Sequence, residues 1–84
     1  MKQPTYPREG TKLRIILDML IAAEGYPVGL HLMMRQANAG AAHSCVSDLR
    51  IKHGWNIKNR MKHVTKDGLT EVHSEYWIPL EDAA

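Results

Sequence analysis

The chain has few of the features that mark secreted or membrane proteins. It has 84 residues and a single cysteine, Cys45, which cannot form an internal disulfide and suits a reducing cytoplasm. The longest apolar segment, LRIILDMLIAA, is interrupted by Arg14 and Asp18 and falls short of the ~18 residues that a membrane span needs. The N-terminus MKQPTYPREG lacks the apolar segment of a signal peptide. We therefore expect a cytoplasmic protein with no part in a membrane.

Acidic residues are missing from the middle of the chain. From Arg50 to Lys66 there are six Lys or Arg residues and no Asp or Glu. The last eighteen residues reverse this balance, with five acidic residues and no Lys or Arg. A net charge of only +2 therefore conceals a sorted distribution, and the middle segment is expected to meet an acidic partner.

Motifs for catalysis and for metal binding are missing as well. We find no Ser-His-acid arrangement, no Gly-rich phosphate loop and no carboxylate pair, and so short a chain leaves little room for a deep pocket. His43 and Cys45 are two residues apart, whereas His53, His63 and His73 are spaced by ten, and neither arrangement matches a structural zinc site. We expect a protein that is not an enzyme and that has no metal or cofactor.

Hydrophobic spacing predicts a first helix after an extended N-terminal arm. The arm, residues 1–9, contains two prolines and is expected to be mobile. Thr11 can cap the helix, which should end near Glu24 because Gly25 and Pro27 follow. Its predicted buried face consists of Leu13, Ile16, Leu17, Leu20 and Ile21.

Two further helices are predicted around a small-residue turn. One spans about residues 30–37 and the next about residues 41–53, with the turn NAGA, residues 38–41, between them. The second helix is expected to face inward with Leu30, Met33, Met34 and Ala37. The third is expected to bury Ala42, Cys45, Val46 and Leu49 and to expose Ser44, Ser47, Asp48 and Ile51, with His43 and Arg50 toward one flank.

Beyond Gly54 the hydrophobic period changes to two, which predicts a hairpin of two strands. The turn is marked by Asp67-Gly68, and the returning strand covers roughly residues 71–80. A lone hairpin is marginal in water, so its apolar side is expected to lie against the helices. That side would hold Trp55, Ile57, Asn59 and Met61 of the first strand and Val72, Ser74, Tyr76, Ile78 and Leu80 of the second.

This order of elements resembles a winged helix-turn-helix domain of the small phage and prophage type. The resemblance is carried by the Gly40 turn, by Val46 and Leu49 after it, by the segment SDLRIKHGWNI and by a hairpin that closes on Tyr76-Trp77-Ile78. It covers about residues 11–80, and Gln36 stands where such motifs usually have Ala. It implies an α+β winged helix-turn-helix with three helices followed by a two-stranded antiparallel β-hairpin wing. The domain would span residues 10–80, with an acidic tail at residues 81–84.

The resemblance also implies a function. In that family the third helix enters the major groove and the wing touches the DNA backbone, so we expect sequence-specific binding of double-stranded DNA by a small phage or prophage transcriptional regulator in the bacterial cytoplasm or nucleoid. Ser and His can bond base edges or phosphates, Arg can grip guanine, and Ile can meet a thymine methyl. Lys2 and Arg8 of the arm would add affinity for the backbone. The expected DNA-binding residues are His43, Ser44, Ser47, Arg50, Ile51 and Lys52 of the third helix and Lys58, Arg60, Lys62 and Lys66 of the wing.

Several alternatives stay open on residues alone. Asp48 would repel phosphate, and it can either accept a bond from cytosine or pair with Lys52 one turn on. Arg50 can instead be a structural partner of an acidic residue, and a basic hairpin can be a solvated face that blocks aggregation. Winged domains also serve as protein-interaction modules, a use that Asp48, an exposed Ile51 and the acidic last strand would suit.

A homodimer is the expected assembly if the protein reads DNA. A single module reads few base pairs, and two-fold symmetry would match a palindromic site.

Overall fold

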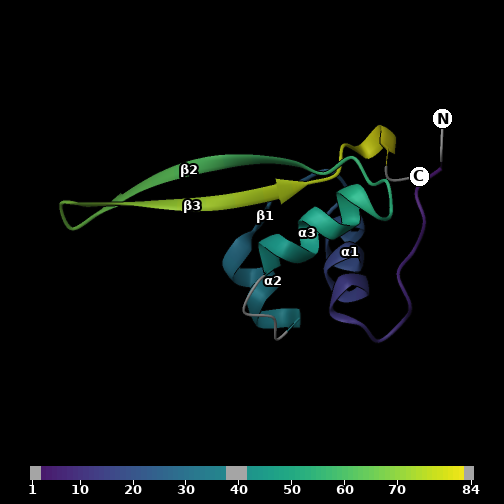
Figure 1. Cartoon of the computed structure of the whole chain (residues 1–84). Coiled ribbons are helices and arrows are strands. Elements are labelled where there is room, and N and C mark those ends of the chain that lie inside the picture. The colour runs from purple at the N-terminus through teal and green to yellow at the C-terminus, as the bar shows by residue number, and fades with distance from the viewer. Residues whose placement is uncertain (1–2, 38–41, 83–84) are drawn as a thin grey trace.

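The computed structural model describes residues 3–37 and 42–82 and has an α+β architecture. Its antiparallel strands form one sheet in the order β1-β3-β2. Figure 1 shows the three helices gathered at the root of the sheet, while the hairpin of β2 and β3 projects away from them. The elements in chain order are α1 (Lys12–Ala22), β1 (Val28–Gly29), α2 (Leu30–Ala37), α3 (Ala42–Ile51), β2 (Lys58–Lys66), β3 (Leu69–Trp77) and the short 3-10 helix η1 (Leu80–Asp82).

The core lies between the three helices and one face of the sheet root. Helix α1 contributes Ile16, Leu17 and Leu20, which recur at the three-and-four spacing of a single helix face. Helices α2 and α3 and the sheet root complete the core with Val28, Met33, Ala37, Ala42, Val46, Leu49, Trp55, Ile57, Tyr76 and Ile78. No helix in residues 3–37 or 42–82 is long and apolar enough to cross a membrane.

The predicted helices are confirmed, with small shifts at their ends. The Thr11 hydroxyl caps α1 by accepting from the Arg14 N–H at 3.3 Å, and α1 ends at Ala22, two residues before the expected end. Helix α2 has the expected bounds, and Ala37 rather than Gln36 faces the core. Helix α3 ends at Ile51 rather than at residue 53, ahead of Gly54 with its φ of +73°. The predicted turn at residues 38–41 lies outside the described residues.

A two-residue strand, β1, was not expected from the sequence. Val28 pairs with Tyr76 and Gly29 pairs with Glu75, which makes the sheet three-stranded instead of two-stranded. A strand this short, between Pro27 and a helix, is too brief to show an alternating pattern. Its pairing fixes the start of α2 against the root of β3.

The expectation that the apolar side of the whole hairpin packs on the helices is wrong. Tyr76 and Ile78 at the root are buried, but Met61 is 61% exposed and Val72 is 54% exposed, and Leu80 beyond the strand is exposed too. The reason is length: β2 and β3 have nine residues each, and their distal halves extend past the helices (Figure 1). An arm of paired strands therefore stands in solvent.

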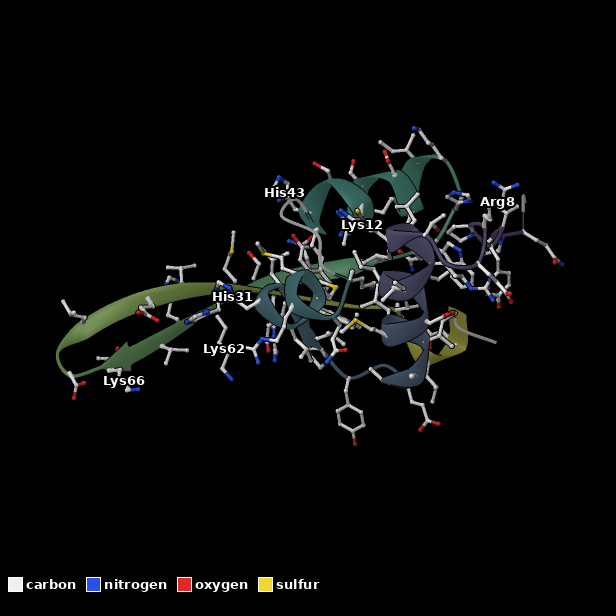
Figure 2. The ribbon with its side chains drawn as sticks, turned by 90° about the horizontal axis from the view of Figure 1, so that it is seen from below. Arg8, Lys12, His31, His43, Lys62 and Lys66 are labelled. Atoms are coloured by element: carbon white, nitrogen blue, oxygen red, sulfur yellow. The ribbon has the colours of Figure 1, made fainter. Side chains whose placement is uncertain are left out.

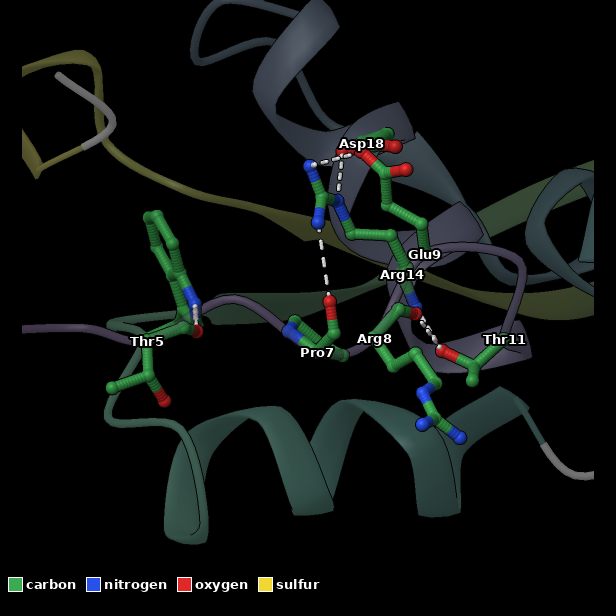
Figure 3. Close-up of polar contacts among 8 residues, drawn as sticks. Thr5, Pro7, Arg8, Glu9, Thr11, Arg14 and Asp18 are labelled. Carbon is green, nitrogen blue, oxygen red and sulfur yellow. Dashed lines mark hydrogen bonds and ion pairs between the residues drawn. The ribbon is translucent and has the colours of Figure 1, made fainter.

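Residues 3–9 of the N-terminal arm are attached to the domain by hydrogen bonds, whereas the sequence suggested a mobile arm. The Trp55 indole N–H donates to the Thr5 carbonyl at 2.7 Å, and the Thr5 N–H donates to the His53 carbonyl at 2.9 Å. Figure 3 shows the second attachment, where Arg14 Nη1 donates to the Pro7 carbonyl at 3.1 Å. The arm thus connects the start of α1 to the segment that follows α3.

Candidate nucleic-acid interface

Helix α3 exposes a face of small polar side chains. Ala42, Val46 and Leu49 point into the core, so the helical period turns His43, Ser44 and Ser47 outward, and all three are exposed. Ile51, at the end of the same helix, is 79% exposed. We call His43, Ser44, Ser47 and Ile51 the α3 face. The sequence predicted the exposure of these four residues.

Asp48 and Lys52 form an ion pair on α3. The Lys52 ammonium lies 3.9 Å from the Asp48 carboxylate, one helical turn away, and both side chains reach solvent. The second of the two readings left open for Asp48, pairing with Lys52, is the one observed. Since Asp48 partly neutralises Lys52, this lysine offers less free positive charge than its exposure suggests.

Arg50 binds the protein itself. Its Nε donates to the Ile57 carbonyl at 2.7 Å and its Nη2 donates to Asn59 Oδ1 at 3.0 Å. The guanidinium carbon also lies 6.0 Å from the centre of the Tyr76 ring. These contacts join the last turn of α3 to the start of β2 and to β3. A structural role was foreseen for Arg50, but with an acidic partner; the partners are a backbone carbonyl and an amide.

The wing cations lie along one face of the hairpin. The register pairs Lys58 with Trp77, Arg60 with Glu75, Lys62 with His73 and Lys66 with Leu69. Side chains alternate along a strand, so these cations lie opposite to the face of Asn59 and Tyr76, which Arg50 contacts. The structure therefore places the row on the sheet face turned away from α3.

One member of this row is neutralised within the hairpin. Arg60 Nε lies 3.0 Å from the Glu75 carboxylate, whose side chain is only 16% exposed, and the Arg60 guanidinium lies 6.0 Å from the Trp77 ring centre. Glu75, on the neighbouring strand, thus neutralises Arg60 in the middle of the predicted row. Within the described residues, Lys58, Lys62 and Lys66 have no ion pair.

The predicted site residues fall into two groups. Figure 2 shows His43 on the α3 side of the molecule, whereas Lys62 and Lys66 lie on the hairpin and on the side turned away from α3. The α3 face is a continuous group, and the lysines form a second group near the hairpin tip. The structure does not bring the two groups onto one flat surface.

Two cations at the start of α1 accompany the α3 face. Arg8 and Lys12 have no ion pair among the described residues, and Figure 2 shows both on the same side of the molecule as His43. Lys12 was not predicted as a site residue, since nothing in its local sequence shows that α1 packs beside α3. Arg8 and Lys2 were both expected to contact the DNA backbone from the arm. Lys2 lies outside the described residues.

Cys45 is a partly buried thiol near this surface. Burial raises the pKa of the Cys45 thiol above its ordinary value, and the Asp48 charge raises this pKa further. The nearby Lys12 charge acts in the opposite direction. The thiol therefore stays protonated at neutral pH and belongs to the packing of α3, as its place in the predicted buried stripe indicated.

Two further searches concern metal sites and similar proteins. Across the part of the chain that the structure describes, no group of three or more His, Cys, Asp or Glu side chains could hold a metal ion. Comparisons with protein families, with curated proteins and with solved structures found no match. The chemistry of the exposed side chains is therefore the ground for a functional conclusion.

Proposed function

We propose that this protein is a winged helix-turn-helix protein that binds double-stranded DNA, with the α3 face toward the bases. The observation that carries the proposal is the setting of that face. The small polar side chains of His43, Ser44 and Ser47 line an exposed helix. Beside it lie Arg8 and Lys12, which form no ion pair within the described part of the chain. Short hydroxyl and imidazole groups let a helix enter the major groove, and flanking cations bind phosphates.

The distribution of unpaired charge supports the same proposal. Among the Lys and Arg side chains that the structure describes, those of Arg8, Lys12, Arg35, Lys58, Lys62 and Lys66 form no ion pair, and Arg50 forms hydrogen bonds to uncharged groups only. Among the described carboxylates, those of Glu24, Asp67 and Glu81 form no ion pair. Free positive charge therefore predominates on the arm, α1 and the hairpin, which a polyanion would approach.

The projecting hairpin supplies a second contact in the proposed complex. Its distal half does not pack on the helices, so it is free to follow the DNA beyond the reach of α3. Lys66 lies at its tip, and Lys62 lies four residues back on the same face. Only Lys66, at the tip and past the helices, would contact the backbone, while Lys58 and Lys62 point away from α3 and stay outside the contact. Arg50 holds α3 and β2 in a fixed relation. The proposed protein acts by occupying a promoter as a small phage or prophage regulator.

A matched pair of lysine variants tests the proposal. Lys12 and Lys58 both lack an ion pair among the described residues, but Lys12 lies on the α3 side and Lys58 on the opposite face of the hairpin. Fluorescence anisotropy with a labelled duplex should show micromolar or tighter binding at low salt that weakens as salt rises. Lys12→Ala should make the slope of log affinity against log salt shallower by about one, whereas Lys58→Ala should leave it unchanged. No binding at low salt, or equal slopes for both variants, would contradict the proposal.

A protein-interaction module is the second candidate function. The specific observations in its favour are the Arg60–Glu75 ion pair, which weakens the basic row, and the exposed apolar side chains Ile51, Met61 and Val72. An assembly factor would use the same α3 face with a protein partner and would show no affinity for a duplex. Duplex binding by the native protein distinguishes the two functions. Ser47→Glu then tests whether the α3 face makes the contact, since the added carboxylate would repel phosphate and reduce duplex binding strongly.

A further inference from the structure

We propose that a second copy of this chain binds to the surface around Trp77, on the sheet face turned away from α3. We call this surface the Trp77 patch. It consists of the residues that line a hollow there, Glu24, Gly25, Tyr26, Trp77, Pro79 and Leu80, together with Lys58, which pairs with Trp77 across the strands. The inference does not rest on DNA binding, because it concerns a different face of the molecule.

The patch surrounds an open hollow of about 450 Å³, which is built from two segments far apart in the sequence. Glu24, Gly25 and Tyr26 line one side, and Trp77, Pro79 and Leu80 line the other. Tyr26 is 75% exposed, and Leu80 is exposed as well. Aromatic side chains held at an open surface are typical of the centre of protein interfaces.

The backbone of this patch is preformed. Glu24 and Gly25 adopt φ angles of +51° and +89°, and such a conformation is uncommon for a residue with a side chain. The turn is held by the Glu24 N–H, which donates to the Ile21 carbonyl at 3.1 Å, and by the Tyr26 N–H, which donates to the Ala23 carbonyl at 3.0 Å. A Cβ atom on Gly25 would lie 3.5 Å from the Leu80 N atom, so the two segments are in contact. A partner would meet an ordered surface.

Charges of opposite sign flank the aromatic centre. The strand order β1-β3-β2 puts Trp77 of β3 in the middle, with Lys58 directly beside it on β2 and the Glu24 turn on the side of β1. Neither Lys58 nor Glu24 has an ion pair within the described residues. A two-fold axis near Trp77 would place Lys58 of each copy against Glu24 of the other. The patch is therefore complementary to itself, which selects a second copy as the occupant.

The proposed contact leaves the α3 face uncovered. Side chains alternate along β3, so Trp77 points away from the side on which Tyr76 packs against the helices. Dimerisation through the Trp77 patch would therefore leave the α3 face accessible to DNA. Its apolar part is small, so we expect a weak dimer that depends on protein concentration.

A charge exchange tests the inference on the intact chain without DNA. Sedimentation velocity over a range of protein concentrations at low salt should show a monomer–dimer equilibrium for the native protein. Lys58→Glu and Glu24→Lys should each weaken dimerisation about tenfold, since each brings like charges together. The double variant Lys58→Glu with Glu24→Lys should restore the native affinity to within about threefold. Tyr26→Ser, which alters an exposed side chain, should weaken the dimer as well.

Lys66→Glu is the matched control, because it makes the same change of charge at the hairpin tip, outside the patch. It should leave dimerisation unchanged. A native protein that stays monomeric at every concentration would overturn the inference, as would a dimer that neither single exchange weakens. A double variant as weak as the single variants would also overturn it. A protein that stays monomeric but still binds duplex DNA would refute the dimer and leave the proposed DNA binding intact.

Discussion

Replacing Arg50 with Ala should lower the free energy of unfolding, and it leaves the side chains of the α3 face unchanged. The change removes two hydrogen bonds, one from Nε to the Ile57 carbonyl at 2.7 Å and one from Nη2 to Asn59 at 3.0 Å. Bonds from a charged donor contribute about 1.5–3 kcal/mol when they are well shielded, and less in solvent. Arg50 is exposed, so we take the lower figure of about 1 kcal/mol for each bond. The expected loss is about 2 kcal/mol of unfolding free energy.

Urea unfolding followed by circular dichroism measures this loss, and a thermal scan should show the midpoint lowered by about 10 °C. Arg50→Lys should recover less than half, because an ammonium group cannot make both bonds of the planar guanidinium. The neighbouring change Ile51→Ala is the control and should cost less than about 0.5 kcal/mol, since this side chain is exposed. Arg50→Ala with native stability and weakened duplex binding would refute the structural role and return Arg50 to the recognition surface.

The remaining predictions concern the hairpin, the arm and the thiol. Ile78→Ala should lower the free energy of unfolding by about 2–5 kcal/mol, because this side chain is fully buried. Val72→Ala, on the projecting part, should lower it by less than about 0.5 kcal/mol, and urea unfolding measures both changes. Tyr6→Ala removes an edge contact to Trp55 at 5.3 Å and should cost about 1 kcal/mol, with a red shift of the tryptophan emission. Cys45 should react with a thiol reagent more slowly in the folded protein than in urea, since its pKa is raised. The same shift makes the stability fall as the pH rises past the ordinary thiol value of 9.0, because the unfolded thiol loses its proton first.

The local parts of the fold could be predicted because they depend on short-range patterns. The face of α1 with Ile16 and Leu20 follows from helical spacing, and the Thr11 cap follows from its side chain. The alternation after Gly54 identified the strands, and Asp67-Gly68 identified their turn. The same alternation placed Lys58 and its neighbours in the row on one face of the hairpin.

The parts that could not be predicted depend on where elements meet. Nothing local shows that Glu75 lies across from Arg60, since this pairing requires the strand register. The attachment of Thr5 to Trp55 joins residues fifty positions apart. The exposure of Met61 follows from the length of the hairpin relative to the helices, which hydrophobic alternation alone does not reveal. The α3 face was predicted, while its flanking cation Lys12 was found only from the packing of α1.

The most direct test of the proposed DNA contact is an amide NMR titration of the isotope-labelled protein with an unlabelled duplex at low salt. We expect shift changes in α3, in the segment from Arg8 to Lys12 and at the hairpin tip around Lys66, with little change around Tyr26. A spectrum that does not respond to the duplex, or one that changes only around Trp77 and Tyr26, would contradict the proposal that the α3 face binds DNA.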